Sequence, residues 1–422
     1  MNQYETDKLK EQAEKLGYEI VDFDGIADIY CINSCSVTNM SQRKSRQMIS
    51  HARKLNSNSI IVTLGCAVES AKDDLDSLNA DILIGNNDKE RTFEIINEYQ
   101  IKKEKQQVIT DIASQKIYNE KLLFTKPYDV RESVKIEDGC NNFCSYCIIP
   151  YLRGRVRSRK YLEIEEEVKG LVSKGVKEII LVGIEVASYG KDLEDITLID
   201  VIERLDKLES LERLRLSSLE PRYLTEDIIK RLAKCKKLCN HFHISMQSGC
   251  SNTLKRMNRK YNKELLISVC NNIRKYFKDA YIAADVIVGF PGETDSEFNE
   301  TKDTIEKMTL NELHVFKYSK RAYTRAAKFE EQVDGNVKKK RSEWLIQYSN
   351  CLKEKFLNEH LNKRQKVLIE NAENGILQGY TTNYIRIKTK GDKSLCGTVQ
   401  DVDVTSLESE TLTGEIVQKI TL

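Results

Sequence analysis

The spacing of apolar and polar residues in the first hundred positions alternates between helical and strand periods. The elements it predicts are a helix ending at Gly17, strands at 28–33, 59–64 and 81–85, and helices at 41–55 and 94–99. This alternation predicts an α/β sheet domain over residues 1–100. Residues 101–125 are rich in charge, lack a clear period and are interpreted as a connection.

Residues 126–361 repeat one strand-and-helix unit. The six strand candidates lie at 132–137, 178–183, 213–217, 241–247, 281–289 and 312–318. Six successive units predict a parallel, partly closed (βα)6 barrel whose chemistry lies at the carboxyl ends of the strands. His241 and His243 share one face of a strand and are interpreted as barrel-layer residues rather than ligands.

Residues 362–422 change to short alternating runs separated by glycines, which predicts a small β-barrel. Along one expected strand, every second residue is aromatic or cationic: Tyr384, Arg386, Lys388 and Lys390. A face of this kind binds single-stranded RNA by stacking and phosphate neutralisation. The alternative is a charged outer face that only keeps the barrel in solution.

Composition narrows the class of protein. The 422 residues carry 67 Lys and Arg against 65 Asp and Glu, so a surface that coats nucleic acid uniformly is not expected. The apolar runs are shorter than the roughly 18 residues of a membrane helix, and residues 1–10 lack the apolar core of a secretory signal. We therefore expect a cytoplasmic protein whose 12 cysteines are metal ligands, reactive thiols or core residues rather than disulfides.

Cys140, Cys144 and Cys147 form a C-x3-C-x2-C motif directly after the first expected barrel strand. Three thiolates suit an iron–sulfur cluster or zinc, since both favour soft sulfur ligands. A cubane held by only three cysteines leaves one iron open to another ligand. The alternatives at this point are a three-cysteine zinc knuckle and a coincidence of spacing.

Together with this motif, six further segments resemble the methylthiotransferase family of radical S-adenosylmethionine enzymes. They lie at 151–159, 183–190, 217–221, 246–250, 257–261 and 289–294. Residues 316–321, with Thr324, are similar to the branch of the family that modifies threonylcarbamoyladenosine in tRNA. The resemblance covers nearly the whole chain and implies that residues 362–422 are an RNA-binding TRAM domain.

The resemblance implies two [4Fe–4S] clusters and S-adenosylmethionine as cofactors. Cys140, Cys144 and Cys147 would hold the cluster that cleaves S-adenosylmethionine to a 5′-deoxyadenosyl radical. Cys35 and Cys66 match two of the three ligands of the sulfur-donating second cluster. The third ligand would fall just upstream of Met1, together with a first strand, so we expect a start codon assigned too far downstream or a fragment.

The family motifs also imply binding residues. Those for S-adenosylmethionine are Gly183, Glu185, Glu220, Gln247, Gly289 and Gly292. Those for RNA are Arg153 and Arg159, within a basic run next to the cluster motif, together with the four strand residues at 384–390. From the residues alone, the glycine-containing segments also have an ordinary explanation as turns and helix starts.

The expected activity is transfer of a methylthio group to C2 of N6-threonylcarbamoyladenosine, at adenosine-37 beside the anticodon. The expected partners are the tRNA anticodon stem-loop and an electron donor such as flavodoxin or ferredoxin. Two alternatives within the family are the isopentenyladenosine tRNA enzyme and the enzyme that modifies a ribosomal protein. A third is an RNA-binding protein with an incomplete sulfur-donating cluster.

Overall fold

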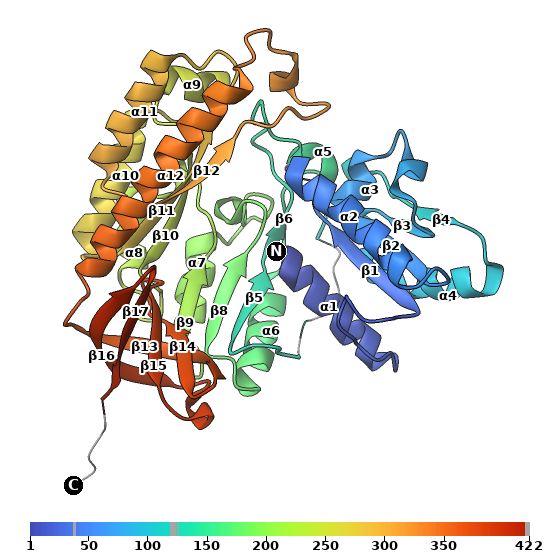
Figure 1. Ribbon diagram of the computed structural model, residues 1–422, viewed down its shortest axis with the longest axis horizontal. Helices are drawn as coiled ribbons and strands as arrows, with labels where there is room; N and C mark the ends of the chain where they lie inside the picture. The colour runs from blue at the N-terminus through green and yellow to red at the C-terminus, as the bar shows by residue number, and fades with distance from the viewer. Residues whose placement is uncertain (37–38, 119–123, 125, 418–422) are drawn as a thin grey trace.

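The computed structural model describes residues 1–36, 39–118, 124 and 126–417. Three parts follow one another along the chain (Figure 1). An N-terminal sheet, drawn in blue, lies beside a central half-barrel, and a small barrel drawn in red lies at the opposite end of the half-barrel. Among the described residues, no helix has the length and apolar character needed to cross a membrane.

The N-terminal part is a parallel sheet with helices on both faces. Its elements are α1 (Asn2–Lys15), β1 (Ile29–Ser34), α2 (Asn39–Leu55), β2 (Ile60–Gly65), α3 (Cys66–Ser70), β3 (Ile82–Ile84), α4 (Thr92–Lys102) and β4 (Gln106–Val108). The strand order is β1-β2-β3-β4. Successive residues of β2 and β3 face opposite cores: Val62 and Ile82 pack with α1 and α4, whereas Ile61 and Leu83 pack with α2.

The central part contains the six parallel strands that the apolar pattern predicts. Its strands are β5 (Arg131–Lys135), β6 (Glu137–Asp138), β7 (Arg157–Ser158), β8 (Glu178–Val182), β9 (Arg213–Leu216), β10 (His241–Gln247), β11 (Tyr281–Val288) and β12 (Glu312–Lys317). They form two parallel sheets, β5-β8-β9 and β10-β11-β12, while β6 and β7 make a short antiparallel pair. A parallel bridge from Leu219 to Ile244 connects the two sheets, and the described strands do not close between β12 and β5.

Helices cover the outer face of this half-barrel. They are α6 (Tyr161–Ser173), α7 (Leu198–Leu205), α8 (Glu226–Leu232), α9 (Ser251–Arg256), α10 (Lys263–Tyr276), α11 (Asp295–Met308) and α12 (Gly335–Asn358). A further short helix, α5 (Ile149–Arg153), lies against α3 of the N-terminal part instead. The alternation along β10 sets the two faces: Phe242, Ile244 and Met246 enter the core beneath the helices. His243 and Gln247 therefore face the concave side.

The C-terminal part is a closed five-stranded barrel, as expected. Its strands are β13 (Arg364–Glu373), β14 (Ile376–Tyr380), β15 (Arg386–Lys390), β16 (Val399–Glu408) and β17 (Thr411–Ile416). Arg213 donates to the carbonyl oxygen of Tyr380 at 2.8 Å, and Arg215 donates to that of Thr381 at 3.4 Å. The small barrel thus lies at the end of the half-barrel opposite the cysteine motif, near the start of β9.

Candidate cluster and cofactor site

Three free cysteines lie on the loop that follows the first strand of the half-barrel. Cys140 and Cys144 are buried and Cys147 is half-buried. Gly139 has a φ of 86°, and a Cβ there would lie 2.0 Å from the carbonyl oxygen of Arg155, so only glycine fits. The loop therefore brings three thiols to the carboxyl end of the strands, where half-barrels carry their chemistry.

The segment after α9 holds this loop in place. The Ser145 amide donates to the carbonyl oxygen of Met257 at 2.9 Å, and its hydroxyl donates to that of Arg256 at 2.8 Å. The side-chain amide of Asn258 donates to the carbonyl oxygen of Phe143 at 2.9 Å. These bonds fix the cysteine backbone relative to the end of β10.

The electrostatic surroundings of the three thiols suit a metal cluster that is bound by thiolates. Arg259 Nη1 donates to Cys144 Sγ at 3.2 Å, which places a positive charge beside the loop. Burial raises the pKa of the Cys140 and Cys147 thiols to about 12, so they become ligands only when a bound metal displaces their protons. Three unpaired thiols with one guanidinium beside them fit a three-thiolate iron–sulfur cluster.

Two buried carboxylates lie near these cysteines. Glu185 follows β8, and its Oε1 has no hydrogen-bond partner among the described residues. Burial raises the pKa of Glu185 to about 7. Glu220 accepts from Arg222 Nε at 2.7 Å and lies 4.0 Å from Arg259 Nη2. The free oxygen of Glu185 is an acceptor suited to a cationic ligand group such as an ammonium.

The glycine before Glu185 is required by close packing. A Cβ at Gly183 would lie 2.5 Å from Glu137 Oε1. Glu137 is fully buried, and its Oε1 accepts the backbone amide of Glu185 at 2.5 Å. Gly183 thus allows the strand end to pass over Glu137, which positions Glu185. The family motif did not identify Glu137.

The other three predicted cofactor residues lie at later strand ends. Gln247 ends β10 with a φ of 67° and is half-buried. Gly289 and Gly292 form the turn after β11, where an added Cβ would meet the side chains of Lys338 and Glu331, respectively. The turn approaches the cysteine loop through Phe290, whose ring centroid is 6.5 Å from that of Tyr146.

The two predicted N-terminal cysteines lie at the carboxyl ends of adjacent parallel strands, Cys35 after β1 and Cys66 after β2. The Ser36 hydroxyl donates to the carbonyl oxygen of Cys66 at 2.9 Å and joins the two loops. Cys66 packs against Ile148 and Leu152, just beyond the cysteine motif. The structure therefore brings both groups of cysteines to the contact between the N-terminal sheet and the half-barrel.

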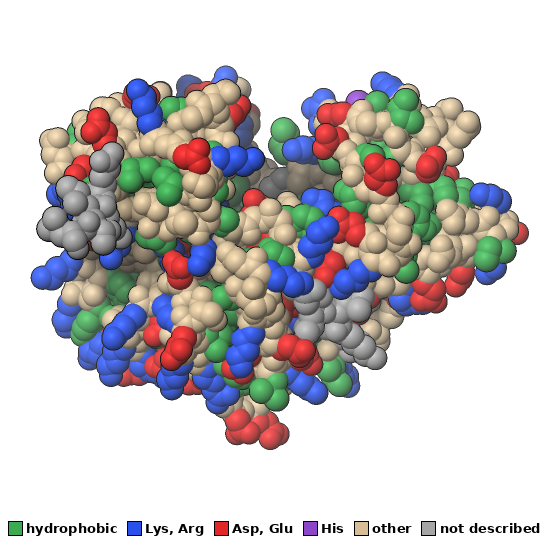
Figure 2. Space-filling view, turned by 90° about the horizontal axis from the view of Figure 1, so that it is seen from below, with side chains coloured by type: hydrophobic (Ala, Val, Ile, Leu, Met, Phe, Trp, Pro, Cys, Tyr) green, Lys and Arg blue, Asp and Glu red, His purple; other side chains and the backbone are tan. Residues whose placement is uncertain are grey.

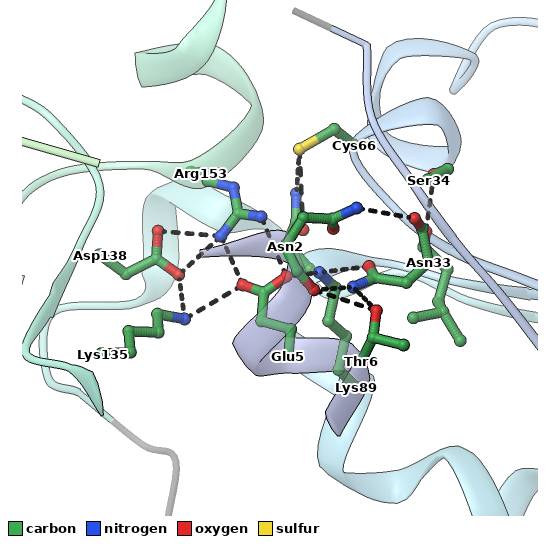
Figure 3. Close-up of polar contacts among 12 residues, drawn as sticks. Asn2, Glu5, Thr6, Asn33, Ser34, Cys66, Lys89, Lys135, Asp138 and Arg153 are labelled. Atoms are coloured by element: carbon green, nitrogen blue, oxygen red, sulfur yellow. Dashed lines mark hydrogen bonds and ion pairs between the residues drawn. The ribbon is translucent and has the colours of Figure 1, made fainter. Parts of the chain in front are cut away.

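A buried ion network crosses the same contact (Figure 3). Arg153 Nη1 lies 2.7 Å from Glu5 Oε1 of α1 and 3.1 Å from Asp138 Oδ2 of β6. Lys89 binds Glu5 at 2.6 Å, and Lys135 binds Asp138 at 2.8 Å. Burial raises the pKa of Glu5, but Arg153, Lys89 and Lys135 outweigh it and hold that pKa well below its usual range.

Comparison with known proteins agrees with this arrangement. The sequence family "Radical SAM superfamily" matches residues 134–305, and "Uncharacterized protein family UPF0004" matches residues 1–85. The threonylcarbamoyladenosine tRNA methylthiotransferase MtaB of Bacillus subtilis (strain 168) is 36% identical, over 96% of this chain and 91% of that protein. The chain belongs to the radical S-adenosylmethionine tRNA methylthiotransferase family.

Two further comparisons concern the substrate and the fold. A tRNA-2-methylthio-N(6)-dimethylallyladenosine synthase of Clostridium botulinum (strain Loch Maree / Type A3) is also 36% identical, over 98% of this chain and 94% of that protein. The radical S-adenosylmethionine methyltransferase TsrM of Kitasatospora setae has a TM-score of 0.59 and 14% identity, covering 76% of this chain and 73% of TsrM. TsrM shows a shared fold, and methylthiotransferases use S-adenosylmethionine and two [4Fe–4S] clusters.

The structure contradicts the predicted RNA contacts of Arg153 and Arg159 in this methylthiotransferase. Arg153 is 4% exposed within the ion network, and Arg159 is 1% exposed. Arg159 Nη2 binds Glu167 Oε2 at 2.7 Å. Both guanidiniums are thus neutralised inside the protein and cannot reach a phosphate.

The four residues predicted on one face of the small barrel are exposed and alternate with buried neighbours, and their contact with RNA stays a prediction. Arg386, Lys388 and Lys390 are exposed on β15, while the residues between them are buried. Tyr384 precedes the strand at a φ of 65° and, at 38% exposed, continues the alternation. Its ring stacks on Tyr380, with centroids 4.8 Å apart, and lies under the guanidinium of Arg215, so it belongs to the contact with the half-barrel.

Basic side chains also gather on α2, which the sequence predicts only as a polar helix. Arg43, Arg46 and Lys54 are exposed along α2, at spacings that place them on one face. Seen from the end of the molecule that carries the small barrel, Lys and Arg side chains are also dense at the lower left, on the side of the small barrel and half-barrel rather than that of α2 (Figure 2). The period of apolar residues predicted α2, because the helix is amphipathic. It could not show which parts of the protein lie beside the exposed cations of α2.

Proposed function

We propose that this methylthiotransferase modifies C2 of N6-threonylcarbamoyladenosine at adenosine-37 of tRNA. The observation that carries the proposal is the identity of 36% with the B. subtilis protein of that name along nearly the full chain. Relatives with the same name in Aquifex aeolicus (strain VF5) and Thermotoga maritima are 35% and 34% identical. The second candidate substrate is the dimethylallyl-modified adenosine, because the C. botulinum synthase is equally similar.

The cysteines of the two parts take different roles in this proposal. Cys140, Cys144 and Cys147 hold the [4Fe–4S] cluster that, when bound, supplies the electron for cleavage of S-adenosylmethionine. Cys35 and Cys66 are ligands of the sulfur-donating cluster. Support comes from their placement: both groups lie at the same contact between the sheet and the half-barrel. An electron donor such as flavodoxin or ferredoxin stays a prediction.

The residues of the chain orient the cofactor rather than react with it. Glu185 offers its unpaired carboxylate oxygen to the ammonium of S-adenosylmethionine, and Gly183 leaves room for Glu137 to hold the Glu185 backbone. Arg259 stabilises negative charge on Cys144. Glu220 and Gln247, at the ends of later strands, contact other parts of the cofactor.

Replacing Glu185 with glutamine is expected to weaken binding of S-adenosylmethionine about 30-fold. The loss of one hydrogen bond between charged groups is worth about 2 kcal/mol, which corresponds to this factor. Equilibrium dialysis on the reconstituted protein measures the dissociation constant. The matched control is Glu194→Gln, because Glu194 lies exposed on the same loop and should leave the constant unchanged. Equal affinity of the Glu185 variant and the unchanged protein would remove Glu185 from the cofactor site.

The RNA contacts are assigned to the exposed cations of β15 and α2. Glutamate at Arg386 and Lys388 is expected to weaken binding of an anticodon stem-loop at least tenfold and to lower the salt dependence by about two units. Filter binding at several salt concentrations measures both. Arg364→Glu is the control, since Arg364 of the same barrel is already neutralised by Asp403 at 2.8 Å. An unchanged salt slope in the double variant would show that this face does not bind RNA.

The choice of substrate is tested by offering the reconstituted enzyme two anticodon stem-loops. One carries threonylcarbamoyladenosine and the other dimethylallyladenosine. We expect the first stem-loop to give the methylthio product at a rate at least tenfold higher than the second. One buried polar contact that only one substrate can make is enough for a preference of this size. A preference for the dimethylallyl substrate would assign the chain to the other activity.

A further inference from the structure

Two histidines and one aspartate meet on the concave face of the half-barrel, away from the cysteine loop. His243 of β10, Asp285 of β11 and His314 of β12 each offer one ligand atom, and these three atoms all lie within 4.8 Å of one another. His243 Nε2 is 2.9 Å from Asp285 Oδ1, and His314 Nδ1 is 3.7 Å from the same oxygen. The three strands are neighbours in one sheet (Figure 1), so the backbone fixes this convergence.

We propose that His243, Asp285 and His314 bind a divalent first-row transition metal ion, such as zinc, through His243 Nε2, Asp285 Oδ1 and His314 Nδ1. Two imidazoles and one carboxylate are a common donor set for such ions. Ligand atoms separated by 2.9 and 3.7 Å span the range expected around one ion whose bonds are about 2.0–2.1 Å. All three atoms lie within 4.8 Å of one another, so they reach one ion once side-chain rotation brings the two ring nitrogens within about 4.2 Å of each other.

The second nitrogen of each imidazole already has the partner that a metal-bound histidine needs. His243 Nδ1 lies 3.1 Å from the Ser218 hydroxyl, and His314 Nε2 lies 3.7 Å from Glu312 Oε2. Groups of this kind fix the tautomer and the ring orientation, so that the other nitrogen faces the metal. Glu312 is itself held by the Tyr281 hydroxyl at 3.0 Å.

The charge of the surroundings favours a cation over an anion. Asp285 and Glu312 both border His314, and these carboxylates, which accept hydrogen bonds from the ring, raise its pKa to about 9. The ammonium of Lys353 binds the other oxygen of Glu312 at 3.3 Å and also binds Glu410. Since His314 is 42% exposed, an ion here would keep a coordination position open to the concave face.

The proposal is tested on the protein after anaerobic reconstitution with iron and sulfide, so that Cys140, Cys144 and Cys147 are occupied by iron. Equilibrium dialysis against zinc, followed by metal analysis, is expected to show about one bound zinc per chain in the unchanged protein. The variants His243→Gln and Asp285→Asn should each lose it. His51→Gln is the matched control, because His51 pairs with Asp24 at 3.0 Å, and it should retain the zinc.

X-ray absorption at the zinc edge identifies the ligands in the unchanged protein. We expect only nitrogen and oxygen neighbours at about 2.0–2.1 Å and no sulfur at about 2.3 Å. Zinc content that is the same in the unchanged protein and in both variants, or a sulfur shell, would overturn the proposal. The spectrum of the unchanged protein decides the question even where a variant fails to fold.

Discussion

Alanine in place of Cys140, Cys144 or Cys147 is expected to remove about four iron atoms per chain and to abolish cleavage of S-adenosylmethionine. Each substitution takes away one of only three thiolates on the loop, and we expect the cluster of the loop to need all three. The loop itself should survive, because hydrogen bonds from Ser145 and Asn258 hold its backbone. Iron and sulfide analysis after anaerobic reconstitution, with assay of 5′-deoxyadenosine, measures both effects.

The control variants are Cys250→Ala and Cys270→Ala. Both cysteines are buried in the half-barrel at a distance from the loop along the chain, and Cys270 belongs to its apolar core. Iron content should stay at the level of the unchanged protein in these variants. Unchanged iron in Cys144→Ala as well would contradict the assignment of the loop as a cluster site.

Methionine in place of Arg153 is expected to destabilise the protein by about 3–5 kcal/mol. The substitution leaves Glu5 and Asp138 buried without their shared guanidinium, and breaking a buried ion pair from one side carries a penalty of this size. Unfolding in guanidinium chloride, followed by a spectroscopic probe placed in the N-terminal sheet, measures the decrease in the free energy of unfolding. Adding Glu5→Gln to Arg153→Met should recover part of it, because one uncompensated charge is removed.

The control for Arg153 is Arg91→Met. Arg91 and Glu94 form an exposed pair at 3.0 Å, and removal of such a pair is expected to cost less than about 1 kcal/mol. A loss in the Arg153 variant no larger than that of the control would show that the ion network does not stabilise the contact between the two parts.

The same network sets a dependence on pH. The pKa of Glu5 in the folded protein lies well below its ordinary value of 4.5, because the cations around it outweigh the effect of burial. Its ionised form therefore stabilises the fold fully above the ordinary pKa, and this contribution disappears as the pH falls through the lowered value. The difference in stability between the unchanged protein and Glu5→Gln should accordingly shrink in acid.

Local periodicity was enough to predict most elements of the fold. The parallel strands of the half-barrel are four to eight residues long and alternate with helices in a repeating order. In that context, an apolar run such as β11 is readily interpreted as a buried strand. β4 falls within the residues interpreted as a connection. Its three residues include Gln106 and Gln107, so neither length nor apolar character marks it, and pairing with β3 alone makes it a strand.

Side chains that depend on distant partners could not be placed from the sequence. Arg153 and Arg159 have the same local pattern as a phosphate-binding run, but Arg153 meets Glu5, which is 148 residues away along the chain. Tyr384 keeps its place on the exposed face, but its ring also stacks on Tyr380 and lies under the guanidinium of Arg215, a contact that no local pattern predicts. His243 becomes a candidate ligand only because β11 and β12 bring Asp285 and His314 beside it.

The most direct test of the proposed function is nucleoside mass spectrometry of tRNA from cells with and without this gene. We predict that the methylthio derivative of threonylcarbamoyladenosine disappears from the deletion strain, while threonylcarbamoyladenosine itself accumulates. The unchanged gene should restore the derivative, and the Cys144→Ala variant should not. Persistence of the methylthio derivative in the deletion strain, with no second enzyme of this activity present, would contradict the account.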